Sequence, residues 1–242
     1  MRERSILLNA EMVRAVLNGS KTQTRRIIQS PAKNMQATGQ KVIDYREPGD
    51  KWYGEHVFSM RNQSGTWCDY TKEQFLAKCP FGEVGDRLWA RETWSDVNLE
   101  GISAIAYRAD EGLRFLTNDD DDGDEDDPRL EKYSFANWYP DLISGTEGIW
   151  RPSIHMPRWA SRITLEITGV RVERLQDISR ADAVAEGGPP SHPSIDAVSR
   201  DYGFPDFSRS WFGQTWWSIY GEESWQANPW VWVIEFKRVE VE

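Results

Sequence analysis

The chain has 242 residues, of which 39% are hydrophobic and 12% aromatic, enough to bury a sizeable core. Its formal net charge of -10 comes largely from residues 119–127, where eight of nine side chains are carboxylates. Setting those eight aside leaves 31 acidic residues against 29 basic ones, and this near-neutral balance argues against a surface dedicated to a long nucleic acid.

Two cysteines, Cys68 and Cys79, are too few for a disulfide scaffold, and no apolar run at the N-terminus resembles a signal peptide. The longest apolar run near the other end, Trp230–Ile234, has the length of a strand and is far too short to span a membrane. We therefore expect a soluble, cytoplasmic protein without a membrane partner.

The first elements are a short strand at Ile6–Leu8 and a helix at Ala10–Leu17, with Asn9 as its N-cap and Gly19 as its stop. The stretch Lys21–Ile28 is rich in Thr, Arg and Ile and favours a strand. A straight strand would point Lys21 and Thr24 to opposite faces, so their cooperation requires Lys21 to precede the pairing.

Residues 30–80 show no regular period and are predicted to be an insertion with a helical turn at Phe75–Ala77. Arg87–Trp94 then alternates as a strand. One of its faces carries Leu88, Ala90 and Glu92, and the other carries Trp89, Arg91 and Thr93. The second face could form a wall for a planar polar ligand, but Trp89 could equally be a core residue with solvated neighbours.

Ile102–Tyr107 is predicted to be a strand, and the acidic run lies in the loop after it. Six positions match a calcium-binding loop: Asn118, Asp120, Asp122, Gly123, Asp124 and Asp126. The last position of such a loop, which requires a bidentate Glu, is Arg129. A solvated acidic loop is therefore the preferred interpretation.

Trp150–Pro157 is expected to be extended, and Arg158–Leu175 predicts the longest strand, broken at Gly169. A short helix at Arg180–Glu186 places its two carboxylates, Asp182 and Glu186, on one face. The rest of the chain predicts a loop over 189–209, an aromatic helix at Ser210–Tyr220 and a closing strand at Trp230–Val239. Short strands without a regular βαβ alternation indicate an α+β fold with a small barrel.

The stretch Gly19-x-Lys21-x-x-Thr24-x-Arg26 resembles the signature of the ASCH family, a branch of the PUA-like barrels, which reads Gly-x-Lys-x-x-Glu-x-Arg. Thr24 replaces the Glu of most members, as it does in the small bacterial N4-acetylcytidine amidohydrolases of the family. Gly85–Leu88 also resembles a turn that opens a barrel strand, and several segments look similar to larger ASCH proteins of phages and prophages.

The resemblance implies an α+β fold: one PUA-like domain over 1–242, a small mixed β-barrel with flanking helices and long loop insertions. The insertions are expected at about 30–80, 110–148 and 188–208. The amidohydrolases use the Lys, the second Thr and a later Glu. The helix that matches theirs makes Glu186 the candidate for this later Glu, with Asp182 as the second choice.

The implied activity is hydrolysis of the amide bond of an N4-acylated cytosine nucleoside, without metal or cofactor. Thr24 would attack the acyl carbonyl, neutral Lys21 would take its proton, and Glu186 would carry a proton to the leaving amine. Arg26 or backbone N–H groups near Gly19 are the candidates for oxyanion stabilisation. Substrate binding is assigned to Arg26 together with Asn9, Trp89 and Arg91, the last three for base recognition.

Other interpretations stay open. Lys21 and Arg26 could be a solvated strand edge, with Thr24 an ordinary strand residue. The chain could be an RNA-binding PUA-like module, a ribonuclease of the ASCH type, or an interaction protein that uses its aromatic helix. The sequence does not determine the acyl group, whether the substrate is a free nucleoside or a base in a polymer, or the oligomeric state.

Overall fold

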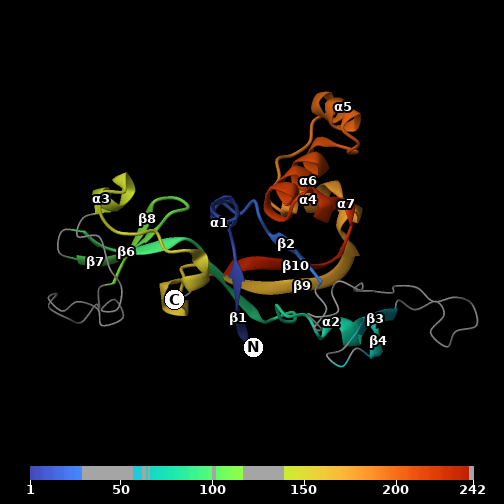
Figure 1. Ribbon diagram of the computed structural model, residues 1–242, viewed down its shortest axis with the longest axis horizontal. Coiled ribbons are helices and arrows are strands. Elements are labelled where there is room, and N and C mark those ends of the chain that lie inside the picture. Colours follow the sequence, from blue (N-terminus) through green and yellow to red (C-terminus); the bar gives the residue numbers. More distant parts are fainter. Residues whose placement is uncertain (29–56, 62–63, 65, 100–101, 117–138, 240–242) are drawn as a thin grey trace, which may run out of the picture. The chain divides into compact units, whose positions relative to one another are not determined.

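The computed structural model describes residues 1–28, 57–61, 64, 66–99, 102–116 and 139–239 (Figure 1). Contacts within the chain divide it into two compact units. The first unit comprises Met1–Arg2, Ser20–Arg87 and Glu166–Lys237, and the second comprises Glu3–Gly19, Leu88–Leu165 and Arg238–Glu242. The expected single domain stays a prediction. The acidic run at 119–127 and most of the first two expected insertions lie outside the described residues.

The chain is a mixed α+β protein, as the sequence predicts. A five-stranded sheet has the order β1-β5-β9-β10-β2, so within the described residues it has two edges and is not closed into a barrel. Its strands are β1 (Glu3–Leu7), β5 (Arg87–Arg91), β9 (Thr164–Arg174), β10 (Trp230–Val239) and β2 (Gln23–Ile27). Among these, β10 has the bounds that the sequence predicts.

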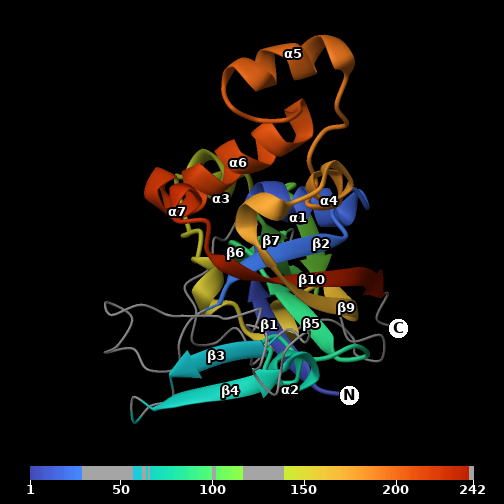
Figure 2. The ribbon, with the colours of Figure 1, turned by 90° about the vertical axis from the view of Figure 1, so that its right-hand side faces the viewer.

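In the first unit, strands β9, β10 and β2 lie side by side, and helices cover one of their faces (Figure 2). These helices are α4 (Arg180–Ala185), α6 (Phe207–Tyr220) and α7 (Glu222–Gln226), and α5 (Pro193–Asp201) lies against α6 on the side away from the sheet. A core of buried side chains joins α4 and α6 to β10: Leu175, Ile178, Ala183, Phe212, Trp216, Val231 and Val233. Most aromatic side chains of α6 are therefore packing residues, which removes a large apolar area from water. A separate hairpin, β3 (Val57–Arg61) and β4 (Trp67–Thr71), is followed by α2 (Lys72–Leu76).

The second unit contains α1 (Ala10–Leu17), which has the predicted bounds and Asn9 as its N-cap. A three-stranded antiparallel sheet follows, made of β6 (Trp94–Leu99), β7 (Ile102–Tyr107) and β8 (Gly112–Phe115). Helix α3 (Tyr139–Ser144) packs Leu142 and Tyr139 against this sheet. No helix in the described part of the chain combines the length and the apolar character needed to cross a membrane.

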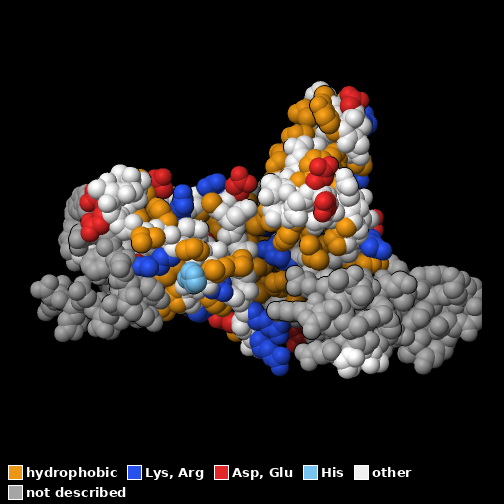
Figure 3. Space-filling view, viewed as in Figure 1, with side chains coloured by type: hydrophobic (Ala, Val, Ile, Leu, Met, Phe, Trp, Pro, Cys, Tyr) orange, Lys and Arg blue, Asp and Glu red, His pale blue; other side chains and the backbone are white. Residues whose placement is uncertain are grey.

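The predicted loop over 189–209 is wrong, because α5 lies within it. His192 caps this helix, and Pro193 stands in its first turn. The helix buries the polar residues Asp196 and Ser199 and exposes the apolar residues Ile195 and Val198. Orange side chains at the upper right of Figure 3 mark this exposed surface. This reversed pattern hides the helix from an analysis of hydrophobic periodicity.

Three strand predictions also need correction. The strand predicted for Arg87–Trp94 ends at Arg91, and β6 begins at Trp94. The segments expected to be extended before Thr164 contain two turns of 3-10 helix, Ser153–His155 and Arg158–Ala160. Strand β9 runs without a break through Gly169. A Cβ atom at Gly169 would lie 2.6 Å from Oε2 of Glu235, so this glycine makes room for a neighbouring side chain.

Candidate functional site

Lys21 precedes β2 and forms an isolated antiparallel β-bridge with Glu186, so the requirement that it lie outside the strand is met. Ser179 caps α4, and Glu186 is the C-cap of this helix. The backbone N–H of Thr22 donates to the carbonyl oxygen of Ala185 at 2.8 Å. Backbone hydrogen bonds therefore bring together two residues that are 165 positions apart in the chain.

The Lys21 ammonium donates to Oε2 of Glu186 at 2.6 Å and to its backbone oxygen at 2.9 Å. Both residues are buried, with exposed fractions of 2% for Lys21 and 6% for Glu186. Burial lowers the pKa of Lys21; the Glu186 carboxylate opposes this shift, and the charges of Arg26 and Arg25 add to it. Lys21 is thus a buried amine whose proton is easier to remove than that of an ordinary lysine.

Thr24 lies in β2 and is fully buried. Its hydroxyl oxygen accepts a hydrogen bond from Nη1 of Arg26 at 2.7 Å, and the same nitrogen donates to the backbone oxygen of Arg25 at 2.9 Å. Because side chains alternate along a strand, Thr24 and Arg26 share one face of β2, and Gln23 and Arg25 share the other. The structure thus joins Lys21 directly to Glu186 and joins Thr24 to Arg26.

The face of β2 that carries Arg25 supports a network of charged groups. Nη1 of Arg25 donates to Gln23 at 2.6 Å and to Oε1 of Glu186 at 3.1 Å, and Nη2 donates to Glu173 at 2.9 Å. Oδ2 of Asp182 lies 3.5 Å from Nη2. Asp182 and Glu186 therefore do share one face of α4, as their spacing predicts.

Asp182, the second choice for the acidic role, has other partners. It accepts hydrogen bonds from Ser179, Gln23 and Arg171. Burial raises its pKa, but the hydrogen bonds from Ser179 and Gln23 and the charges of two guanidinium groups outweigh burial and lower the pKa. Asp182 is thus a poor proton donor, and Glu186 is the carboxylate in contact with Lys21.

The three residues predicted to recognise a base, Asn9, Trp89 and Arg91, belong to the second unit. Oδ1 of Asn9 accepts the backbone N–H of Met12 at 2.8 Å, so this side chain acts as a helix cap. Trp89 and Arg91 are partly exposed, and the Arg91 guanidinium lies 5.7 Å from the centre of the Trp89 ring. Arg158 lies 6.0 Å from the same ring. Trp89 and Arg91 thus lie close together on β5, whereas Thr93, the third member of the predicted wall, lies beyond the end of this strand.

No family model, no curated protein and no solved structure matches this chain. Membership of the ASCH family therefore stays a prediction, and the geometry of the first unit supplies the grounds for a functional proposal.

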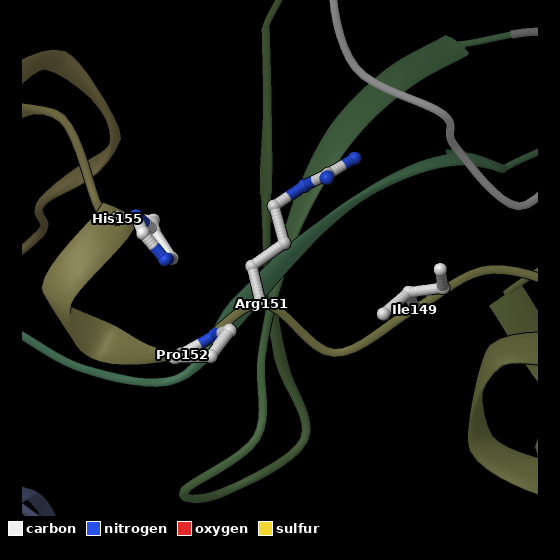
Figure 4. Close-up of a pocket in the computed structure, with 4 residues that line it drawn as sticks. All are labelled: Ile149, Arg151, Pro152 and His155. Atoms are coloured by element: carbon white, nitrogen blue, oxygen red, sulfur yellow. The ribbon is translucent and has the colours of Figure 1, made fainter.

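Two pockets of the second unit were missed by the sequence analysis. One, of about 400 Å³, is lined by Ile149, Arg151, Pro152 and His155 (Figure 4). Its Arg151 is held by Oδ1 of the buried Asp96, at 2.9 Å from Nε and 2.5 Å from Nη2. The other, of about 240 Å³, is lined by Ala10, Arg14, Glu92, Thr93, Arg108 and Ala109. The lining of the first pocket comes from the single stretch 149–155, which carries no recognisable motif, and the lining of the second comes from three separate stretches, so spacing in the sequence indicated neither pocket.

Proposed function

We propose that this chain hydrolyses the amide bond of an N4-acylated cytosine nucleoside, with a PUA-like domain of the ASCH type as scaffold. Thr24 is the nucleophile, Lys21 the base and Glu186 the proton carrier, and no metal or cofactor takes part. The observation that carries the proposal is the buried pair of Lys21 and Glu186, whose charged atoms are 2.6 Å apart.

An ordinary strand edge does not account for this pair. A lysine at a solvated edge extends into water, whereas the side chain of Lys21 is 1% exposed. Removing an ammonium and a carboxylate from water is unfavourable, and a buried ion pair often stabilises a protein less than apolar residues would. A lysine whose pKa is lowered by burial is neutral, and able to accept a proton from a hydroxyl, at a lower pH than an ordinary lysine.

In the proposed first step, Oγ1 of Thr24 bonds to the acyl carbon, and its proton passes to neutral Lys21. The tetrahedral oxyanion accepts a hydrogen bond from Arg26. When it collapses, the bond between the carbonyl carbon and N4 breaks, and N4 takes the proton back from Lys21 through Glu186. Water then attacks the acyl ester on Thr24 and gives one proton to Glu186. Glu186 returns this proton to Oγ1 of Thr24 as the ester bond breaks, which releases the carboxylic acid and the free Thr24 hydroxyl.

This mechanism makes two geometric demands. Nζ of Lys21 must turn from Glu186 toward Oγ1 of Thr24. Because Thr24 is fully buried, the substrate must also displace the side chains that cover this residue. Arg26 is half-buried and already donates to the attacking oxygen, so it is the group that the substrate meets on this path.

The test is incubation of the purified protein with N4-acetylcytidine, with cytidine and acetate followed by chromatography. We expect turnover by the wild type, retention of turnover by Thr24→Ser, and its loss in Lys21→Ala, Thr24→Ala and Glu186→Ala. The matched control is Lys237→Ala, which breaks an exposed Lys–Glu pair of 2.9 Å and should leave turnover intact. A folded wild type without turnover would overturn the proposal and favour RNA binding without catalysis.

A further inference from the structure

Arg25 occupies the position that the amidohydrolase motif leaves open, between Thr24 and Arg26. Its side chain is 0% exposed, although it carries a permanent charge. Its guanidinium is held by Gln23, Glu173 and Glu186 at 2.6 to 3.1 Å, and it lies 5.7 Å from the centre of the Phe212 ring. A charge buried so completely must be offset by fixed partners, so the position of Arg25 is well defined.

The Glu186 carboxylate is divided between two cations. Oε2 accepts from Lys21 at 2.6 Å, and Oε1 accepts from Arg25 at 3.1 Å. Rotation of the carboxylate about its terminal bond would weaken both hydrogen bonds. Arg25 therefore constrains the orientation of Glu186 even when Lys21 turns away.

The two cations differ in chemistry. A guanidinium keeps its proton at any pH at which a protein stays folded, whereas a buried lysine ammonium can lose one. When Lys21 gives up its proton or moves toward the substrate, Arg25 remains as the charged partner of Glu186. The carboxylate is then not left buried and unpaired, a situation that is strongly unfavourable.

We propose that Arg25 is a positioning residue, which holds the second oxygen of Glu186 so that Lys21 and Glu186 can exchange a proton in a fixed geometry. This inference rests on the proposed function for its kinetic consequences. Its structural content, that Arg25 controls the Lys21–Glu186 pair, can be measured without turnover.

Removal of Arg25 has a defined electrostatic consequence. Arg25 is one of the charges that lower the pKa of Lys21, and it also shares the negative charge of Glu186 that raises this pKa. Without Arg25, Lys21 holds its proton more tightly. The acid limb of the kcat/KM profile is the pH range in which Lys21 is protonated and the enzyme loses activity. This limb therefore moves to higher pH.

The kinetic experiment compares Arg25→Lys and Arg25→Gln with the wild type on N4-acetylcytidine. In both variants we expect kcat to fall about 10- to 100-fold with KM little changed, because a catalytic group is misplaced. The acid limb moves up in Arg25→Gln and stays in place in Arg25→Lys, which keeps the charge. The matched control is Arg171→Gln, which removes a charge from the same network without contact to Glu186 and should leave the profile unchanged.

Arg25→Lys also guards against loss of folding, because it leaves no carboxylate without a cation. Wild-type kcat in Arg25→Lys, together with an unchanged acid limb in Arg25→Gln, would overturn the inference. A wild type without turnover refutes the proposed function instead. NMR titration of the Lys21 side chain in the wild type and Arg25→Gln then decides: a raised pKa in the variant supports the inference, and an unchanged one overturns it.

Discussion

The two units of this chain both bury carboxylates, but Glu92 and Asp96 of the second unit pair with arginines, whereas Glu186 of the first pairs with a lysine as well as with an arginine. In the second unit Arg162 binds the buried Glu92 with two parallel hydrogen bonds of 2.9 Å and also contacts Asp110. Arg151 holds Asp96, which is fully buried. In the first unit the buried cation nearest to Glu186 is a lysine, at 2.6 Å.

This difference separates a structural pair from a candidate catalytic one. Burial raises the pKa of Glu92 and of Asp96, and in both cases the guanidinium partner opposes the shift. These arginines cannot give up a proton, so the pairs they form hold the fold and move no charge. Burial lowers the pKa of Lys21, so the Lys21–Glu186 pair can carry a proton. A buried charged group alone therefore does not indicate a catalytic site. A buried group that can lose its proton does.

The largest expected effect comes from making the first unit resemble the second. Lys21→Arg keeps a positive charge beside Glu186 but removes the amine that is proposed to take the proton of Thr24. We expect the hydrolysis rate to fall by up to about 10,000-fold, the range attributed to general acid–base catalysis. The measurement is kcat on N4-acetylcytidine, with circular dichroism as a control for folding. Activity within tenfold of the wild type would contradict a basic role for Lys21.

The second unit should respond in its stability. Arg162→Met leaves Glu92, which is 1% exposed, without its forked partner. We expect the free energy of unfolding in urea to fall by about 3–5 kcal/mol, the usual cost of breaking a buried pair on one side. Arg158→Met is the matched control, because its pair with Glu3 is exposed and is expected to contribute less than about 1 kcal/mol. An equal loss of unfolding free energy in the two variants would show that burial does not make the Arg162–Glu92 pair more stabilising than the exposed Arg158–Glu3 pair.

The sequence predicts those elements whose periodicity and caps agree. Helix α1 has an apolar stripe, an N-cap at Asn9 and a stop at Gly19, and its bounds are confirmed, as are those of β7 and β10. Helix α5 escapes prediction because its polar Asp196 is buried by tertiary partners: Arg180, Ser191 and the backbone N–H of Phe207. These partners lie outside the helix, 5 to 16 positions from Asp196, so the periodicity of residues 193–201 does not reveal them.

In the candidate site, too, some features could be predicted from the sequence and others could not. The meeting of Lys21 and Glu186 follows from the resemblance and from the C-cap position of Glu186, so it could be predicted. Arg25 could not be predicted as the centre of a network, because its partners Glu173, Asp182 and Glu186 lie on two later elements. Their convergence depends on the pairing of β2 with β10 and on the packing of α4, which spacing alone does not specify.

The pH dependence of kcat/KM in the wild type tests whether Lys21 is the group that loses its proton before the reaction. The proposed base is the neutral amine, and burial lowers its pKa below the ordinary value for lysine. We expect kcat/KM to rise about tenfold per pH unit on the acid side and to level off at a pH below that ordinary value. A profile of kcat/KM from pH 5 to pH 10 measures this. A rate that still rises at the ordinary lysine pKa would contradict the lowered value.

The smallest effect is expected for an exposed pair of the same chemistry in the same unit. Lys237 and Glu166 are 2.9 Å apart, but the Lys237 side chain is 59% exposed. A double-mutant cycle with Lys237→Ala and Glu166→Ala should give a coupling of about 0.2–1 kcal/mol, which fades in 1 M salt. The same cycle for Lys21 and Glu186 should give a larger coupling that persists in salt, because water and ions do not reach the pair. If salt weakens both couplings alike, the Lys21–Glu186 pair is solvated, and both its lowered pKa and its proposed role lose their physical basis.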